Sequence, residues 1–197
     1  HETAALPTAV LSTHTGRFQG YTFRDLTDDI PGICAHWERE GLDFSAVYTG
    51  YLASARQIAL VRDVIRSRLR PGGVLIVDPA MADDGRLYSG FGTDVVDAMR
   101  TLCAEADYIL PNVTEAALLA GLSFSSADET LLYAQQVKDA VITSVGSGNR
   151  IGYLARLDGR VTLVQKESVD MTVHGAGDVF TSALSGELLS GQAPQTA

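Results

Sequence analysis

The chain has 197 residues, of which 46% are hydrophobic, and this predicts one domain with a sizeable core. Its formal net charge of −9 at pH 7 argues against nucleic-acid partners and anionic membranes. No apolar run approaches the ~20 residues of a membrane span. The two cysteines have no metal-type spacing and the four histidines form no cluster, which favours a reduced, cytoplasmic protein without a zinc site.

Alternating strands and helices are predicted along almost the whole chain. Ile58, Val61 and Ile65 recur at helical spacing, and the Asp158-Gly159 pair between two alternating stretches is a hairpin signal. In chain order, the expected elements are a strand at 8–12, a helix at 28–40, a strand at 46–49, a helix at 54–69, a strand at 74–77, a helix at 93–105, a strand at 108–110, helices at 113–120 and 127–137, strands at 140–143, 151–157 and 161–166, and a helix at 179–189. The Pro-Gly-Gly stretch at 71–73 is expected to end the second helix. This rhythm indicates an α/β fold with a mostly parallel sheet covered by helices.

Polar residues follow several of the predicted strands. They lie at 49–51, 78–79, 111–112, 143–144 and 175–178. In open α/β sheets, ligands bind beyond the carboxyl ends of the strands. We therefore expect one site built from distant stretches of the chain.

The stretch at 172–184 carries the strongest chemical signal. Gly175 and Gly177 bracket Ala176, and Asp178 precedes an apolar helix. Such glycines allow a tight turn, and a helix N-terminus behind them presents unpaired N–H groups to an anion such as phosphate. An aspartate beside that seat fits a base that takes a proton from a hydroxyl group during phosphoryl transfer. The alternative is a plain loop in which Asp178 is the helix N-cap.

Five stretches of the chain together resemble a known family. They lie at 6–15, 48–51, 77–88, 106–115 and 175–178. This ordered set resembles the pyridoxal (pyridoxine/pyridoxamine) kinases of the ribokinase-like superfamily. The last stretch is shared across that superfamily, whereas the first two resemble the vitamin B6 kinases more specifically.

The resemblance implies a three-layer ribokinase-like sandwich with helices on both faces of the sheet. Residues 1–197 would be a single kinase domain that lacks the family's first strand and last helices. Asp178 matches the catalytic base of the family, and Gly175, Ala176 and Gly177 match its anion hole.

The resemblance also implies a site for ATP and Mg²⁺. Asp78 and Asp83 match acidic positions near the ATP phosphates and cations, and Asp83 is an expected metal ligand. Mg²⁺ prefers such oxygen ligands, often through water. The alternative for Asp83 is a surface turn at 83–85, whereas Asp78 follows a strongly apolar strand and is harder to explain structurally.

Asn112 and Glu115 match the family's Asn-x-x-Glu motif for metal and phosphate, with Glu115 as a second metal ligand. Their spacing puts both on one face of a first helical turn, and it equally fits a capping box. Thr143 and Ser144 match a strand end that contacts ATP phosphates and, in many members, a monovalent cation such as K⁺. The alternative for these two is an ordinary strand end.

On the substrate side, His14, Thr15 and Tyr51 match positions that line the pyridine ring of the vitamer. Their alternatives are a strand-end histidine, a turn threonine and a core tyrosine.

The function that the resemblance implies is ATP-dependent phosphorylation of the 5′-hydroxymethyl group of pyridoxal, pyridoxine or pyridoxamine in vitamin B6 salvage, by a cytoplasmic homodimer. Two alternatives stay open: a hydroxymethylpyrimidine kinase of thiamine synthesis, and a non-catalytic protein that binds a vitamer or a nucleotide. Retention of Asp178 and Glu115 argues against the last, because binding alone needs no base.

Overall fold

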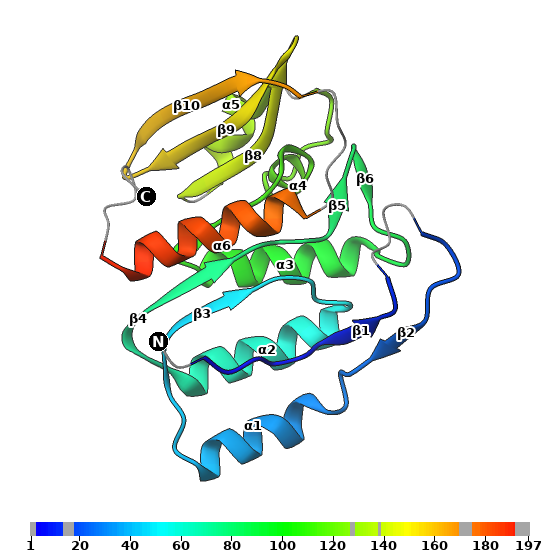
Figure 1. Cartoon of the computed structure of the whole chain (residues 1–197), viewed down its shortest axis with the longest axis vertical. Helices are drawn as coiled ribbons and strands as arrows, with labels where there is room; N and C mark the ends of the chain where they lie inside the picture. The colour runs from blue at the N-terminus through cyan, green and yellow to red at the C-terminus, as the bar shows by residue number, and fades with distance from the viewer. Residues whose placement is uncertain (1–2, 14–17, 127–128, 138, 170–174, 192–197) are drawn as a thin grey trace.

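A six-stranded sheet runs through the centre of the computed structural model, which describes residues 3–13, 18–126, 129–137, 139–169 and 175–191 (Figure 1). Its strands are β3 (Phe44–Thr49), β4 (Leu69–Val77), β7 (Tyr108–Ile109), β8 (Ala140–Ser147), β9 (Arg150–Leu157) and β10 (Arg160–Glu167). They lie in the order β10-β9-β8-β7-β4-β3. The pairs from β3 to β8 are parallel, and β8, β9 and β10 pair antiparallel. The predicted mostly parallel α/β sheet is therefore confirmed.

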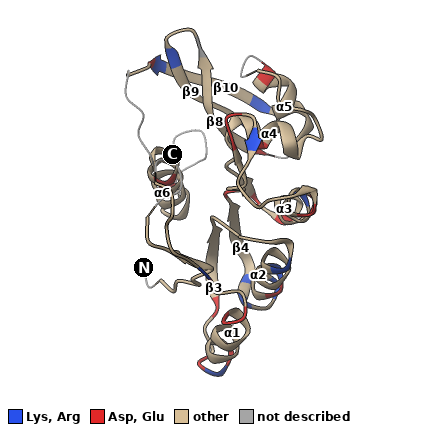
Figure 2. Ribbon diagram, turned by 90° about the vertical axis from the view of Figure 1, so that its right-hand side faces the viewer, with Lys and Arg blue, Asp and Glu red and all other residues tan. Residues whose placement is uncertain are grey.

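Helices cover both faces of this sheet. They are α1 (Ile30–Arg39), α2 (Ala55–Arg68), α3 (Thr93–Glu105), α4 (Val113–Leu119), α5 (Thr130–Gln136) and α6 (Ala176–Leu189). Figure 2 shows α6 on one side of the strands and α2, α3, α4 and α5 on the opposite side. The larger apolar core includes Ile58 of α2 and Met99 of α3, whereas the smaller core joins Ile76 of β4 to Leu184 of α6. This arrangement confirms the predicted three-layer sandwich.

Two elements begin three or more residues earlier than predicted. Helix α6 starts at Ala176 rather than at 179, because the chain enters the helix directly after Gly175, which has a φ of 83°. Strand β4 starts at Leu69, so the stretch at 71–73 lies inside the strand rather than in a helix-ending turn. The pairing with β3 shifts register there, between Phe44 and Ala46, and β4 pairs with β7 only at Ile76 and Val77, so the proline and glycines lie at a bulge before the fully paired part of the strand.

Short strands complete the fold around the sheet. Strands β1 (Ala9–Leu11) and β2 (Phe23–Asp25) pair with each other, as do β5 (Ala82–Asp83) and β6 (Arg86–Leu87). The predicted hairpin is present between β9 and β10, where Asp158 and Gly159 both have positive φ, as a two-residue hairpin turn requires. None of the helices in the described ranges has the length and apolar character that crossing a membrane requires.

Candidate active site

One cleft collects the polar ends of the parallel strands and the start of α6. Its volume is about 2000 Å³. It is lined by each of the predicted site residues within the described ranges: Tyr51, Asp78, Asp83, Asn112, Glu115, Thr143, Ser144, Gly175, Ala176, Gly177 and Asp178. His14 and Thr15 lie outside the described residues. The fold thus brings together stretches that are separated by more than a hundred residues in the sequence.

The first turn of α6 forms one wall of the cleft. Gly175 is the N-cap in a left-handed conformation, and its carbonyl oxygen accepts the first helical hydrogen bond from the Val179 amide at 3.1 Å. The first amides of a helix have no partner within the helix, so those of this turn are available to an anion. Asp178 lies in the same turn and is exposed, and it is not the N-cap. The alternative of a capping aspartate is therefore wrong.

Asp78 directly follows β4 and lines the same cleft. Its amide donates to the Thr49 carbonyl oxygen at 2.9 Å, which continues the pairing of β3 with β4. Its Oδ2 accepts a hydrogen bond from the Tyr48 hydroxyl at 3.1 Å. Burial raises the pKa of Asp78 to about 6, the Tyr48 hydrogen bond opposes this rise, and the charge of Asp178 adds to it. Asp78 and Asp178 both line the cleft.

Glu115 is 2% exposed and holds two loops together. Its Oε1 accepts from the amides of Met81 at 2.9 Å and Ala82 at 3.3 Å, and its Oε2 accepts from the amide of Asn112 at 2.8 Å. Asn112 Oδ1 in turn accepts from the Glu115 amide at 3.0 Å, so the predicted capping box of α4 is present. Burial raises the pKa of Glu115 to about 8, although the three amides oppose the rise.

The acidic turn at 83–85 joins β5 to β6. Asp84 and Gly85 have positive φ, and the Gly85 amide donates to Thr114 Oγ1 at 3.0 Å. The Asp83 carboxylate accepts from the Asp84 amide at 2.9 Å and is exposed. The alternative of a surface turn is thus present, and that turn also borders the cleft.

A bulge in β8 carries Thr143 and Ser144. The Thr143 amide donates to the Pro111 carbonyl oxygen at 2.9 Å, and the ladder with β9 is interrupted between Ile142 and Val145. Ser144 has a φ of 60°, which non-glycine residues rarely adopt. Such strain at a cleft is typical of functional sites. These two residues are therefore not an ordinary strand end.

Sequence reasoning predicted Tyr51 as a site residue but did not predict its aromatic neighbours in the cleft, Tyr88 and Phe91. Tyr51 stacks on Phe91 with ring centroids 5.7 Å apart, and Tyr88 lies 6.1 Å from Phe91. Burial and the nearby carboxylates raise the pKa of Tyr88. The available signal was the aromatic spacing in the stretch after Asp83, which periodicity alone does not distinguish from core residues.

The oxygen atoms of the cleft fit a divalent cation bound together with phosphate. Within the described residues, no group of three or more His, Cys, Asp and Glu side chains could hold a metal ion. The donors that face the cleft are carboxylate and hydroxyl oxygens, the type that Mg²⁺ takes in small number when phosphate and water complete its shell. Chemically, this arrangement can hold an anion at α6 and accept a proton at Asp178.

The chain is similar to known kinases in both sequence and structure. The profile of the family described as phosphomethylpyrimidine kinase matches residues 21–197. A pyridoxine/pyridoxal/pyridoxamine kinase of Bordetella avium is 32% identical over 74% of this chain and 53% of its own length. The chain thus spans about half of that relative.

Two solved structures are similar over nearly the whole chain. The pyridoxal kinase of Lactobacillus plantarum is 35% identical with a TM-score of 0.86, over 97% of this chain and 71% of its own. A protein of Bacteroides thetaiotaomicron, described as a phosphomethylpyrimidine kinase and crystallised with pyridoxal, is 38% identical with a TM-score of 0.86, over 96% of this chain and 70% of its own. The chain therefore belongs to the phosphomethylpyrimidine kinase family, in which its relatives include pyridoxal kinases of the ribokinase-like fold.

Proposed function

We propose that this protein is an ATP-dependent kinase that phosphorylates the 5′-hydroxymethyl group of pyridoxal, pyridoxine or pyridoxamine. One observation carries the proposal: the exposed carboxylate of Asp178 lies in the open first turn of α6, in the same cleft as Asp78 and Glu115. Phosphoryl transfer to a hydroxyl group needs a general base, a site that binds the phosphoryl anion and oxygen ligands for a metal ion.

In the proposed reaction, Asp178 accepts the proton of the hydroxymethyl group. The oxygen of that group bonds to the γ-phosphorus of ATP, the bond from the γ-phosphorus to the bridging oxygen breaks, and ADP leaves. The amides of Gly175, Ala176 and Gly177 stabilise the charge on the transferring group. Positioning and electrostatic stabilisation supply most of the rate, since the protein forms no covalent bond.

The nucleotide side of the site comprises Asp78, Asp83, Asn112 and Glu115, with Thr143 and Ser144 near the phosphates and a monovalent cation such as K⁺. Asp83 and Glu115 would hold Mg²⁺ through their oxygens and water. Bound Mg²⁺ would neutralise charge on the phosphates. The three amides on Glu115 support a fixed carboxylate at this point.

The vitamer side comprises Tyr51, with His14 and Thr15 from outside the described residues. Stacking of Tyr51 on Phe91 supports a flat, rigid wall for a pyridine ring. The pyridoxal in the Bacteroides thetaiotaomicron structure supports this choice of substrate. We also propose a cytoplasmic homodimer, as in the family that the sequence resembles.

A second candidate is a hydroxymethylpyrimidine kinase. The description of the family and of the Bacteroides thetaiotaomicron protein favours it. Its substrate carries a similar ring and the same hydroxymethyl group, so the base and the anion seat would serve unchanged.

The test is ADP release by the full-length protein with ATP, Mg²⁺ and K⁺, with and without excess chelator, against the three vitamers and hydroxymethylpyrimidine in parallel. Asp178→Asn should lower kcat by about 10²–10⁴-fold, the range for loss of a general base. Asp94→Asn is the matched control, because Asp94 is an exposed carboxylate in the first turn of α3 and does not line the cleft. Near-native turnover of Asp178→Asn would refute its role, and turnover of the pyrimidine alone would favour the second candidate.

A further inference from the structure

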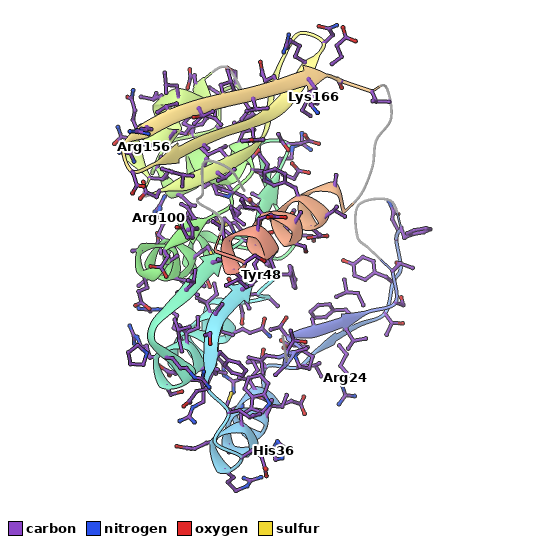
Figure 3. The ribbon with its side chains drawn as sticks, turned by 60° about the vertical axis from the view of Figure 1, so that its left-hand side comes forward. Arg24, His36, Tyr48, Arg100, Arg156 and Lys166 are labelled. Carbon is purple, nitrogen blue, oxygen red and sulfur yellow. The ribbon has the colours of Figure 1, made fainter. Side chains whose placement is uncertain are left out.

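A chain of hydroxyl groups joins α6 to the end of β4. The Tyr48 hydroxyl lies 3.1 Å from Asp78 Oδ2 and 3.1 Å from Thr181 Oγ1. Thr181 Oγ1 also lies 3.2 Å from the carbonyl oxygen of Asp178. Figure 3 labels Tyr48 where β3 passes next to α6. Three elements that are far apart in the sequence thus meet at one phenol oxygen.

The number of hydrogens defines the direction of these bonds. An ionised Asp78 can only accept, so the single hydrogen of Tyr48 points to Asp78, and the single hydrogen of Thr181 is shared between its two acceptors, the Tyr48 oxygen and the Asp178 carbonyl oxygen. Burial raises the pKa of Tyr48, and the charges of Asp78 and Asp178 contribute to the rise, so the phenol keeps its hydrogen at neutral pH. Thr181 is 2% exposed, so water does not readily replace Tyr48 as its partner.

The apolar contacts of α6 do not by themselves fix its position along the sheet. Leu184, Phe180 and Leu188 of α6 pack in the smaller apolar core, and such contacts are non-directional. A hydrogen bond constrains distance and angle, and Thr181 lies one turn from Asp178 on the same helix. The hydroxyl chain is therefore a directional contact between α6 and the sheet, and it lies one helical turn from the proposed base.

We propose that Tyr48 and Thr181 are positioning residues, which hold the first turn of α6, and with it Asp178, in register with Asp78 at the end of β4. This inference rests on the proposed function, because Asp178 is the proposed base. A displacement of about 1 Å in a reacting group can cost up to about 10²-fold in rate. Because the proposed effect is on the position of Asp178, the chain should act on turnover more than on substrate binding.

The test compares Tyr48→Phe, Thr181→Val and the double variant in the full-length protein. Each single substitution breaks the Tyr48–Thr181 hydrogen bond and should lower kcat about ten-fold, the factor that corresponds to ~1.4 kcal/mol, and change the KM for ATP and acceptor by less than about two-fold. The kcat of the double variant should be no lower than that of the less active single variant, because both substitutions break the same chain. Thr181→Ser keeps the hydroxyl and should retain most of the wild-type kcat.

Tyr153→Phe is the matched control. The Tyr153 ring packs on Phe180 of the same helix at 5.3 Å, and the described residues offer its hydroxyl no hydrogen-bond partner. Its kcat should equal that of the wild type.

A kcat of Tyr48→Phe within two-fold of an active wild type would overturn the inference, as would equal losses in Tyr153→Phe. Urea unfolding of the wild type, Tyr48→Phe, Thr181→Val and the double variant supplies a readout that does not depend on turnover. Additive shifts of the two single variants in the unfolding midpoint would overturn the hydroxyl chain whatever the activity. A wild type that phosphorylates none of the acceptors would instead refute the proposed function, and the catalytic part of this inference with it.

Discussion

Gly177→Ala separates the stability of α6 from its proposed role in holding phosphate. Gly177 is exposed in the first turn of the helix, and a Cβ added there would meet no atom within 4 Å. Its φ is not in the left-handed region, unlike that of Gly175, so alanine fits without strain. Alanine in a helix is more stable than glycine by about 0.5–1 kcal/mol, which should raise Tm by about 1–4 °C in a domain of this size.

The same substitution should reduce activity. The space into which the methyl group would project is where the proposed reaction puts the transferring phosphoryl group. Filling a packed site with an extra methyl group costs about 1–3 kcal/mol, which corresponds to a loss of roughly five- to 160-fold in kcat/KM. The variant should therefore be more stable and less active than the wild type, a combination that general damage to the fold does not produce.

Gly186→Ala is the matched control on the same helix. Gly186 is also exposed, and a Cβ there would also meet no atom within 4 Å, but it lies away from the cleft. Thermal unfolding and ADP release should be measured for both variants. If Gly177→Ala gains stability and keeps the kcat/KM of Gly186→Ala, the phosphate seat does not lie at the start of α6.

Two further predictions concern stability. Gly175→Ala should destabilise the protein by about 1–2 kcal/mol, since Gly175 has a φ of 83° and a side chain is strained there; an unchanged urea midpoint would contradict this. Asp78 has a pKa of about 6 against an ordinary value of 3.8, so the folded protein holds its proton more tightly than the unfolded chain does. The stability from this proton is complete below about pH 4 and is lost as pH rises through about 6, so the free energy of unfolding should fall over that range by less in Asp78→Asn than in the wild type. The free energy of unfolding can be measured by urea unfolding at a series of pH values. If it changes with pH equally in Asp78→Asn and in the wild type, the raised pKa does not belong to Asp78.

Much of the fold follows from local patterns in the sequence. The period of the apolar residues in α2 predicts its face, and Ser54 is the N-cap, with its hydroxyl accepting from the Gln57 amide at 3.2 Å. The Asp158-Gly159 pair predicts the hairpin because a two-residue turn needs positive φ at both positions. These features depend on neighbouring residues only, which is why the sequence suffices for them.

Contacts across the sheet were not predictable in this way. Tyr48 is an exposed residue in a strand, and Thr181 is a small polar residue in an apolar helix. Their hydrogen bond spans 133 positions in the sequence and depends on α6 lying next to β3. The start of β4 was misjudged for a similar reason, since pairing with Phe44 extends the strand through a stretch that locally favours a turn.

Asn112 and Glu115 show where local reasoning reaches its limit. The spacing of three predicts a capping box, and one is present. A cap, however, needs Glu115 to accept only from the Asn112 amide, and exposed glutamates do this without loss of hydration. Here the carboxylate is buried and also accepts from two amides of the loop that follows β4, and Asn112 Nδ2 donates to the Ala82 carbonyl oxygen at 2.7 Å. Burying a carboxylate is costly, and a surface cap would not require it. The pair therefore ties α4 to the loop between Asp78 and Asp83, and this explains why one motif can serve both the helix and the proposed nucleotide site.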